Sequence, residues 1–259
     1  MPAPALPRSA AGPYNPWLIA VIVSIATFME VLDTTIANVA LRHIAGGLAA
    51  GEDESTYITT SYLVSNAIIL PISGWLAGVI GRKRFYMICV ALFTVSSVAC
   101  GFATSLPMMI AFRVMQGLGG GGLAPVEQSI FADTFPTDKR AMAFALYGLT
   151  VVTAPAVGPV LGGWITDNYS WHWVFFINLP VGLVSLGLTG WFVSDSPQMI
   201  ADRRQLLARG LRIDYLGFVL VVLGFGALQI VLDKYEREDG FSSGFIRTLS
   251  IVAASRSRR

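Results

Sequence analysis

The sequence predicts an all-helical integral membrane protein. Only 13% of its 259 residues are charged, whereas soluble domains average about 25%. Hydrophobic residues make up 54%, and the mean hydropathy is +0.63. Seven apolar segments of near-bilayer length follow one another, and short connections make most neighbours antiparallel. We expect helices at about 17–41, 57–80, 84–104, 106–131, 141–166, 173–193 and 213–233.

The composition also excludes several classes of protein. A net charge of +2 without a basic, aromatic-rich helix does not indicate a nucleic-acid partner, and the lipid bilayer is the partner that the composition indicates. Cys89 and Cys100 would lie about 16 Å apart on one helix, too far for a disulfide, so we expect packing roles. The two histidines, His43 and His172, fall in loops, and no serine-hydrolase or zinc-protease motif occurs. We therefore expect neither an enzyme nor a cofactor or metal site.

Charge bias sets the predicted orientation and the domain boundaries. Residues 1–16 form a Pro- and Ala-rich tail before a first helix that is too long for a signal peptide. With this tail in the cytoplasm, ten lysines and arginines lie inside and three outside, so the N-terminus is predicted to be cytoplasmic. Residues 17–193 then form a six-helix bundle, and 213–233 a seventh helix. We expect a short inner surface helix within 194–212, and in 234–259 an outer loop and the start of an eighth helix that is truncated.

Aromatic residues gather near the predicted outer ends of the fifth and sixth helices. They are Trp164, Tyr169, Trp171 and Trp173. Such residues commonly anchor helices at the membrane interface, so we expect them to form an interfacial belt.

Two acids lie inside the first predicted helix. Glu30 and Asp33 are three residues apart and share one side of a helix. A charged side chain at the centre of a membrane helix costs about 2.5–3.5 kcal/mol, so we expect this side to line a polar cavity. Reversible protonation is one role for the acids. The alternative is a structural carboxylate neutralised by a cation or by hydrogen bonds.

The fourth predicted helix carries a cation at a matching depth. Arg113 lies about seven residues from the outer end of its helix, and Asp33 about eight, so their depths agree within about 2 Å. Protonating the acid would remove its attraction for Arg113, which makes the pair a usable switch. Gly117 and Gly121 would let another helix approach closely, and packing alone accounts for this glycine run equally well.

Small residues also mark the fifth helix and the loop after the second. Ala154, Gly158 and Gly162 form one stripe, while Pro155 and Pro159 predict a kink and a flat face. The segment GWLAGVIGRKR over 74–84 joins two helices through a tight turn at Gly81. In it, Gly74 and Gly78 predict close helix packing, and three cations follow at 82–84, among the inner headgroups.

These motifs together resemble the major facilitator superfamily. The 74–84 segment resembles its loop between helices 2 and 3, RVMQG over 113–117 its helix-4 motif, and GPVLGG over 158–163 the antiporter motif of its proton-coupled exporters. LDTTIANVA over 32–40 and WVFFINLP over 173–180 are similar to the fourteen-helix drug:proton antiporters, the EmrB/QacA-like branch. Order and spacing agree over residues 15–250.

The resemblance implies the fold and the function. It implies the six-helix N-terminal bundle of a transporter plus one extra helix, with alternating access and substrate near the membrane midplane. Inward-moving protons would drive efflux of amphipathic, often cationic drugs across the inner (plasma) membrane. A membrane-fusion adaptor completes the route in Gram-negative relatives. Two alternatives stay open: a proton-coupled transporter of one metabolite or siderophore, and a fragment that acts only by association.

The resemblance also assigns candidate site residues. The proton-coupling residues are Asp33, Glu30 and Arg113; the cytoplasmic gate motif comprises Gly74, Gly81, Arg82, Lys83 and Asp133; the antiporter motif comprises Gly158, Pro159, Gly162 and Gly163; and the substrate-cavity candidates are Asp33, Gln116 and Glu127.

The sequence departs from the family pattern at two positions. Gly78 replaces the loop aspartate, which weakens the family's charge relay, although Arg82 and Asp133 match its other gate pair. Arg42 replaces a proline at the outer rim of the first helix. Glu127 has two open interpretations besides the cavity, as a second proton site or as a partner of the cations at 82–84.

Overall fold

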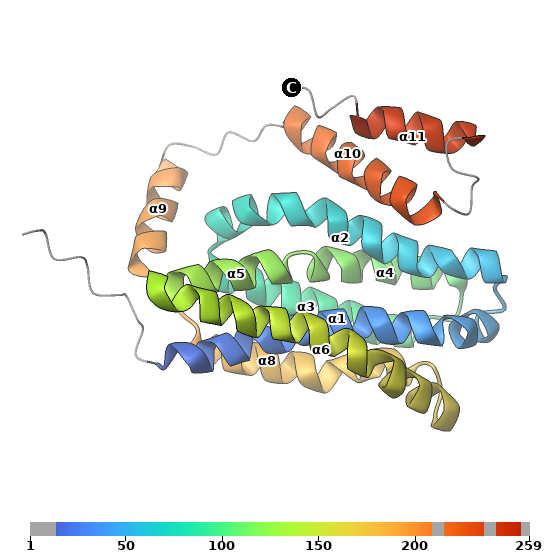
Figure 1. The fold of residues 1–259 in the computed structure, drawn as a ribbon, viewed down its shortest axis with the longest axis horizontal. Coiled ribbons are helices and arrows are strands. Elements are labelled where there is room, and N and C mark those ends of the chain that lie inside the picture. The colour runs from blue at the N-terminus through green and yellow to red at the C-terminus, as the bar shows by residue number, and fades with distance from the viewer. Residues whose placement is uncertain (1–13, 209–214, 236–241, 255–259) are drawn as a thin grey trace, which may run out of the picture.

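The computed structural model describes residues 14–208, 215–235 and 242–254, and every regular element within them is a helix. The membrane-spanning core runs from α1 to α8, and α9 to α11 follow (Figure 1). The bounds are α1 Pro16–Gly47, α2 Glu52–Ile80, α3 Arg82–Gly101, α4 Leu106–Gly120, α5 Leu123–Thr134, α6 Thr137–Asn168, α7 Trp173–Phe176, α8 Asn178–Phe192, α9 Pro197–Ala208, α10 Tyr215–Lys234 and α11 Gly244–Ala254.

The all-helical membrane fold is confirmed, but the fourth predicted helix is broken. Five helical stretches of the described chain are long and apolar enough to span a membrane, and Leu216–Leu232 of α10 is a shorter apolar stretch. The predicted segment 106–131 forms α4 and α5, which lie end to end (Figure 1). Pro125 lacks the N–H that would bond the carbonyl of Gly121, and glycines have low helix propensity, so the ladder is interrupted there.

A proline also interrupts the sixth predicted helix, whereas the first helix lacks a proline at its outer end and is longer than predicted. Pro180 cannot donate to Phe176, and the helix is divided at Ile177 into α7 and α8. The first helix begins with Asn15, whose side chain accepts from the N–H of Trp17 at 2.9 Å. With Arg42 and no proline at the outer rim, α1 continues to Gly47, beyond the predicted end at residue 41.

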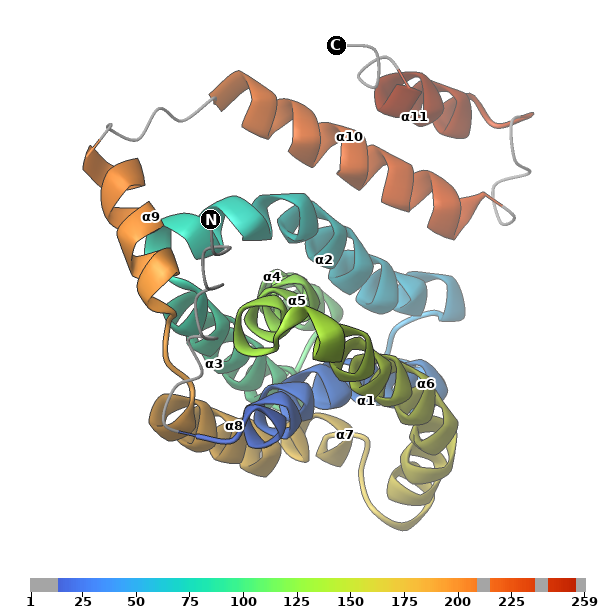
Figure 2. The same cartoon turned by 60° about the vertical axis from the view of Figure 1, so that its left-hand side comes forward.

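The helices form one bundle with α1 near its centre. α1 packs against α6 and α8, while α4 packs between α2 and α3 (Figure 2). Where α4 meets α2, a side chain on Gly117 or Gly121 would overlap Tyr62, Ser65, Asn66 or Ile69, so these glycines do permit close approach. Outside the core, α10 lies along α2 and α11 along α10. A cavity of about 450 Å³ opens between α2, α4, α10 and α11.

Several segments bear on the predicted boundaries and on the belt. α9 lies within the predicted surface segment, and α11 lies where an eighth helix was expected to start. Four predicted parts fall outside the described residues: the tail up to residue 13 with Arg8, the inner cations Arg209 and Arg212, the acidic outer loop at 236–241, and residues 255–259.

The predicted aromatic belt is only partly exposed. Trp164, Tyr169 and Trp173 are exposed, as a belt requires, but Trp171 is buried. Its indole fills the space beside Gly47, where α1 ends, so its role is packing.

Candidate functional site

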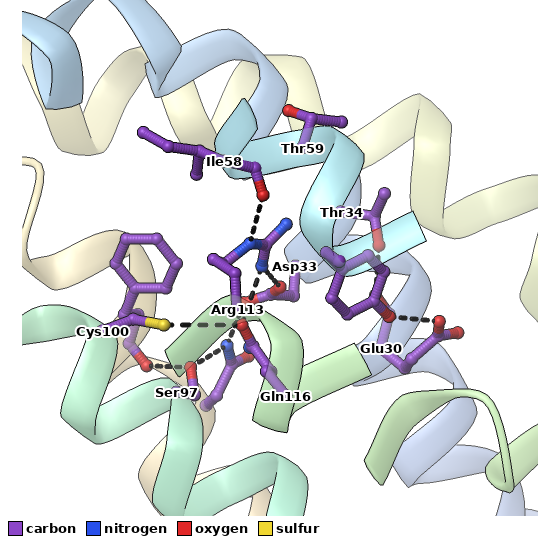
Figure 3. A network of polar contacts seen from close by, with 12 residues as sticks. Glu30, Asp33, Thr34, Ile58, Thr59, Ser97, Cys100, Arg113 and Gln116 are labelled. Carbon is purple, nitrogen blue, oxygen red and sulfur yellow. Dashed lines mark hydrogen bonds and ion pairs between the residues drawn. The ribbon is translucent and has the colours of Figure 1, made fainter. Parts of the chain in front are cut away.

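The centre of the bundle holds an enclosed ion pair between Asp33 of α1 and Arg113 of α4. Nη1 of Arg113 donates to Oδ2 of Asp33 at 2.9 Å, and both side chains are 0% exposed (Figure 3). The matching depths predicted this contact. Because water is excluded, each charge depends on the other and on nearby dipoles for its stabilisation.

Neighbouring donors complete the environment of Asp33. Asn178, the first residue of α8, donates through Nδ2 to Oδ1 of Asp33 at 2.5 Å and to Oγ of Ser97 at 2.8 Å. Ser97 in turn donates to the carbonyl of Phe175 at 2.9 Å. A guanidinium and an amide NH₂ can only donate, so this arrangement matches an ionised Asp33. The carboxylate thereby ties α1 to α4 and α8.

Arg113 is held from three further directions. It donates to Oε1 of Gln116 at 2.7 Å and to the carbonyl of Ile58 at 3.3 Å, and its guanidinium lies 4.4 Å from the centre of the Tyr62 ring. Among the described residues, Nη2 of Arg113 and Nε2 of Gln116 are buried without a partner. An unpaired buried donor costs about 1–3 kcal/mol. The network is therefore not arranged for stability alone.

Glu30 forms a second polar cluster beside the ion pair. Its Oε1 accepts from the hydroxyl of Tyr62 at 2.5 Å and from Nδ2 of Asn66 at 3.1 Å. The Tyr62 ring thus faces Arg113 while its hydroxyl contacts Glu30. Glu30 is only partly buried, unlike Asp33. The two acids of α1 therefore differ in access and in partners.

The substrate-cavity candidates are enclosed in the described bundle, whereas Glu30 is partly exposed. Asp33, Gln116 and Glu127 are each 0% exposed, and none of them lines the cavity of about 450 Å³ beside α10 or the hollow of about 420 Å³ beside α9. Helices α2, α4, α5 and α8 pack against α1, and Asp33 is enclosed among them. In this conformation the three substrate-cavity candidates cannot contact a substrate directly.

The cytoplasmic gate motif forms a second site, at the end where α3 begins. Arg82 forms an ion pair with Asp133 of α5 and donates to the carbonyl of Ser129 at 3.4 Å. The Lys83 ammonium donates to the carbonyl of Gly190 at 2.7 Å, joining α3 to the end of α8. Glu127 instead accepts from Ser24 and Thr27 of α1, so the alternative that it partners the cations at 82–84 is wrong.

The loop glycines have different environments from those predicted. No atom lies within 4 Å of the position of a Cβ on Gly74 or Gly78, so the predicted close packing is wrong in the described structure. Both line a hollow of about 420 Å³ together with Arg82 and α9 residues. Gly81 has φ +103°, a backbone conformation that is strained for any residue with a Cβ. Beside it, Asp195 accepts from the backbone N–H of Lys83 at 2.9 Å and so caps α3 from a remote segment.

The antiporter motif lies on α6, which stays helical through Pro155 and Pro159. Gly158 and Gly162 face Thr35 and Ile36 of α1, whereas a Cβ on Gly163 would meet no atom within 4 Å. Of the motif's three glycines, Gly158 and Gly162 therefore contribute to the α1–α6 contact and Gly163 does not. That contact connects the motif to the helix that carries Asp33.

We expect Gly158→Ala to destabilise the bundle and Gly163→Ala to preserve or increase its stability. A Cβ at 158 would overlap the side chain of Thr35, and overpacking costs about 1–3 kcal/mol. At 163 alanine gains up to about 1 kcal/mol of helix propensity. Thermal unfolding in detergent measures both changes, and equal melting temperatures for the two variants would contradict this packing.

Comparison with known proteins identifies the family. The Major Facilitator Superfamily model matches residues 23–255. The chain belongs to the major facilitator superfamily. It is thus a multi-pass membrane protein of a transporter family, and the enzyme alternative is excluded.

Two relatives and one solved structure show how much of a full transporter is present. The chain is 45% identical over 236 residues to the Multidrug export protein EmrB of Haemophilus influenzae, covering 91% of this chain and 45% of that protein. It is 43% identical to the Fatty acid resistance protein FarB of Neisseria gonorrhoeae, covering 89% and 44%. The xylose transporter XylE from E. coli, in a partially occluded inward open conformation, shares the fold at 14% identity, with a TM-score of 0.66, over 94% of this chain and 61% of that one. The chain thus spans less than half the length of these curated relatives.

Some residues of the site were not predicted. Asn178, Ser97, Tyr62 and Asn66 complete the buried network, and Asp195 caps α3. Asn178 offered a signal, because it is a lone amide in an apolar run. Serine and tyrosine are common in membrane helices, and their spacing alone does not single them out.

Proposed function

We propose that the chain forms the N-terminal half of a proton-coupled multidrug exporter, with one additional helix. The observation that carries the proposal is the enclosed Asp33–Arg113 pair, shared between α1, α4 and α8. A buried ionisable pair in a membrane bundle is expensive and marks ion or proton pathways. Relatives named for multidrug export, at 43% and 45% identity, support drugs as the cargo.

In this mechanism the proton acts on the contacts between helices. When Asp33 takes up a proton, it loses its charge attraction for Arg113, and the O–H meets N–H donors on both sides. Arg113 would then be a buried cation without a counter-ion, which favours an arrangement that hydrates it. α1 separates from α4 and α8 as a result. Loss of the proton restores the closed packing.

The proposed substrates are amphipathic molecules of either charge. The sequence favours cationic drugs, whereas FarB is named for resistance to fatty acids and is as similar to this chain as EmrB is. Because the candidate acids are enclosed, they do not select the substrate charge by direct contact in this conformation. A transporter of one metabolite or siderophore and a fragment that acts only by association are the two alternatives.

We place the protein in the inner membrane with its N-terminus in the cytoplasm. The first turns of α3 and α6, together with α9, gather the basic residues at one end of the bundle (Figure 1), which supports the charge rule. The Arg82–Asp133 pair and the Asp195 cap would close the inner side as the gate. The motif of Gly158, Pro159, Gly162 and Gly163 would carry movement between α6 and α1. An adaptor protein is the proposed partner in a Gram-negative host.

The test measures proton-linked transport by this chain in everted membrane vesicles. We expect an acidic interior to drive uptake of a fluorescent quaternary ammonium dye, and dye addition to dissipate the pH gradient. Collapse of the gradient with an uncoupler should stop uptake. If vesicles with the chain accumulate no more dye than vesicles without it, the drug-exporter function is rejected in favour of the two alternatives. Competition by a fatty acid separates a broad exporter from a strictly cationic one.

A further inference from the structure

A third acid inside the bundle, Glu127 of α5, is not used by the mechanism above. Its side chain is 0% exposed, and its carboxylate accepts from Oγ of Ser24 at 2.6 Å and from Oγ1 of Thr27. Within the described residues, no lysine, arginine or histidine nitrogen lies within 4 Å of it. A buried charge that lacks a cation is costly to maintain. Glu127 therefore differs from Asp33, which has Arg113.

The groups around Glu127 are neutral or acidic. α1 contributes Glu30, three residues beyond Thr27; α3 contributes Tyr86, and α6 contributes Tyr147. Tyr147 interacts electrostatically with both Glu127 and Glu30. The acids of α2 all lie in its first turn. The one charged residue of α4 is Arg113, which is 14 residues from Glu127 and therefore about 21 Å away along the helical direction at 1.5 Å per residue. A negative charge on Glu127 consequently has little compensation.

The partners of Glu127 can accommodate either protonation state. A hydroxyl both donates and accepts, whereas the guanidinium and amide around Asp33 only donate. With an ionised Glu127, Ser24 and Thr27 both donate to it, as the described geometry permits. With a neutral Glu127, the carboxyl O–H donates to one hydroxyl oxygen, and that hydroxyl turns to a backbone carbonyl one turn earlier. The change requires rotation of one hydroxyl only.

We propose that Glu127 is a second proton-binding site, placed on the gate side of the Asp33–Arg113 pair. One carboxylate oxygen takes up a proton from solvent hydronium, and deprotonation returns it to water. Solvent is near, because Val126 and Ser129 on the same helix line the hollow of about 420 Å³ beside Arg82. Asp133, the partner of Arg82, lies six residues further along α5. Glu127 thus stands between the gate and Glu30.

Thr27 and Glu30 connect this site to the centre of the bundle. Ser24, Thr27, Glu30 and Asp33 follow one another at three-residue spacing on α1, so each is a neighbour of the next. Glu30 contacts Tyr62, whose ring faces Arg113. The inference depends on the proposed function only for the use of this proton in transport, since the binding site itself can be tested without transport.

Infrared difference spectroscopy of the purified chain in lipid nanodiscs, titrated from acid to alkaline pH, tests the site. We expect a carbonyl-stretching band of a protonated carboxyl group that disappears on alkaline titration. Glu127→Gln should lose this band, and Asp33→Asn should retain it. The double variant Ser24→Ala/Thr27→Val keeps the carboxyl but removes both hydroxyls, so the band should move to higher frequency.

The outcomes separate this site from the transport mechanism. If wild type and Glu127→Gln give the same bands throughout the titration, or if the double variant leaves the band unmoved, the proposal is wrong. Should Glu127→Gln fail to fold, the double variant and labelling of glutamate carboxyls with ¹³C decide the assignment. Loss of the band without any dye transport by wild-type vesicles would support the proton site and reject the exporter function. Dye transport by wild-type vesicles, together with an unchanged band in Glu127→Gln, would reject only the proton site at Glu127.

Discussion

Asp33→Asn is expected to abolish proton-coupled dye transport while the protein still folds. Asparagine has nearly the same shape, so α1, α4 and α8 can still pack, but the side chain no longer gains or loses a proton. Dye uptake driven by the pH gradient should fall to the level of vesicles without the chain. In detergent solution, the proton release that accompanies dye binding should fall by about one proton per chain, because one titrating group is removed.

Asp167→Asn provides the matched control. Asp167 is exposed near the end of α6, so the same chemical change there should leave both uptake and proton release unaltered. Full pH-dependent uptake by Asp33→Asn would exclude Asp33 as the carrier. In that case Glu30 or Glu127 would have to supply the proton.

Arg113→Met is expected to give the largest loss of stability. It leaves the Asp33 carboxylate buried with Asn178 as its remaining donor, and breaking one side of a buried pair costs about 3–5 kcal/mol. It also removes the cation from the Tyr62 ring and the bond to Ile58. Denaturant-induced unfolding in mixed micelles measures the loss in the free energy of unfolding.

The double variant Asp33→Asn/Arg113→Met tests whether the loss comes from the stranded charge. With the charge removed, the double variant should be more stable than Arg113→Met alone. The two single effects would then be strongly non-additive, as expected for side chains in contact. Additive losses would show that the two residues stabilise the bundle independently, contrary to the ion pair.

Much of the fold is predictable from composition and spacing, because the bilayer imposes it. Backbone groups in lipid must be satisfied within a helix, so apolar segments of sufficient length identify most spans. The breaks are equally local: Pro125 and Pro180 each lack one donor, which explains the ends of α4 and α7. The prediction missed them because apolar content, rather than the backbone hydrogen bonds, defined its helices.

The site was predictable only in part. The sequence by itself determined that Asp33 and Arg113 lie at one depth, since depth follows from the rise per residue. It did not determine that Asn178 completes the environment of Asp33, which lies 145 positions away in the chain. Nor did it determine that Glu127 accepts hydrogen bonds from Ser24 and Thr27, which lie 103 and 100 positions away. It also assigned a cavity to Asp33, which is enclosed, and close packing to Gly74 and Gly78, which face a hollow. Only the tertiary structure decides such points, because helical periodicity gives the direction of a side chain but not what lies opposite it.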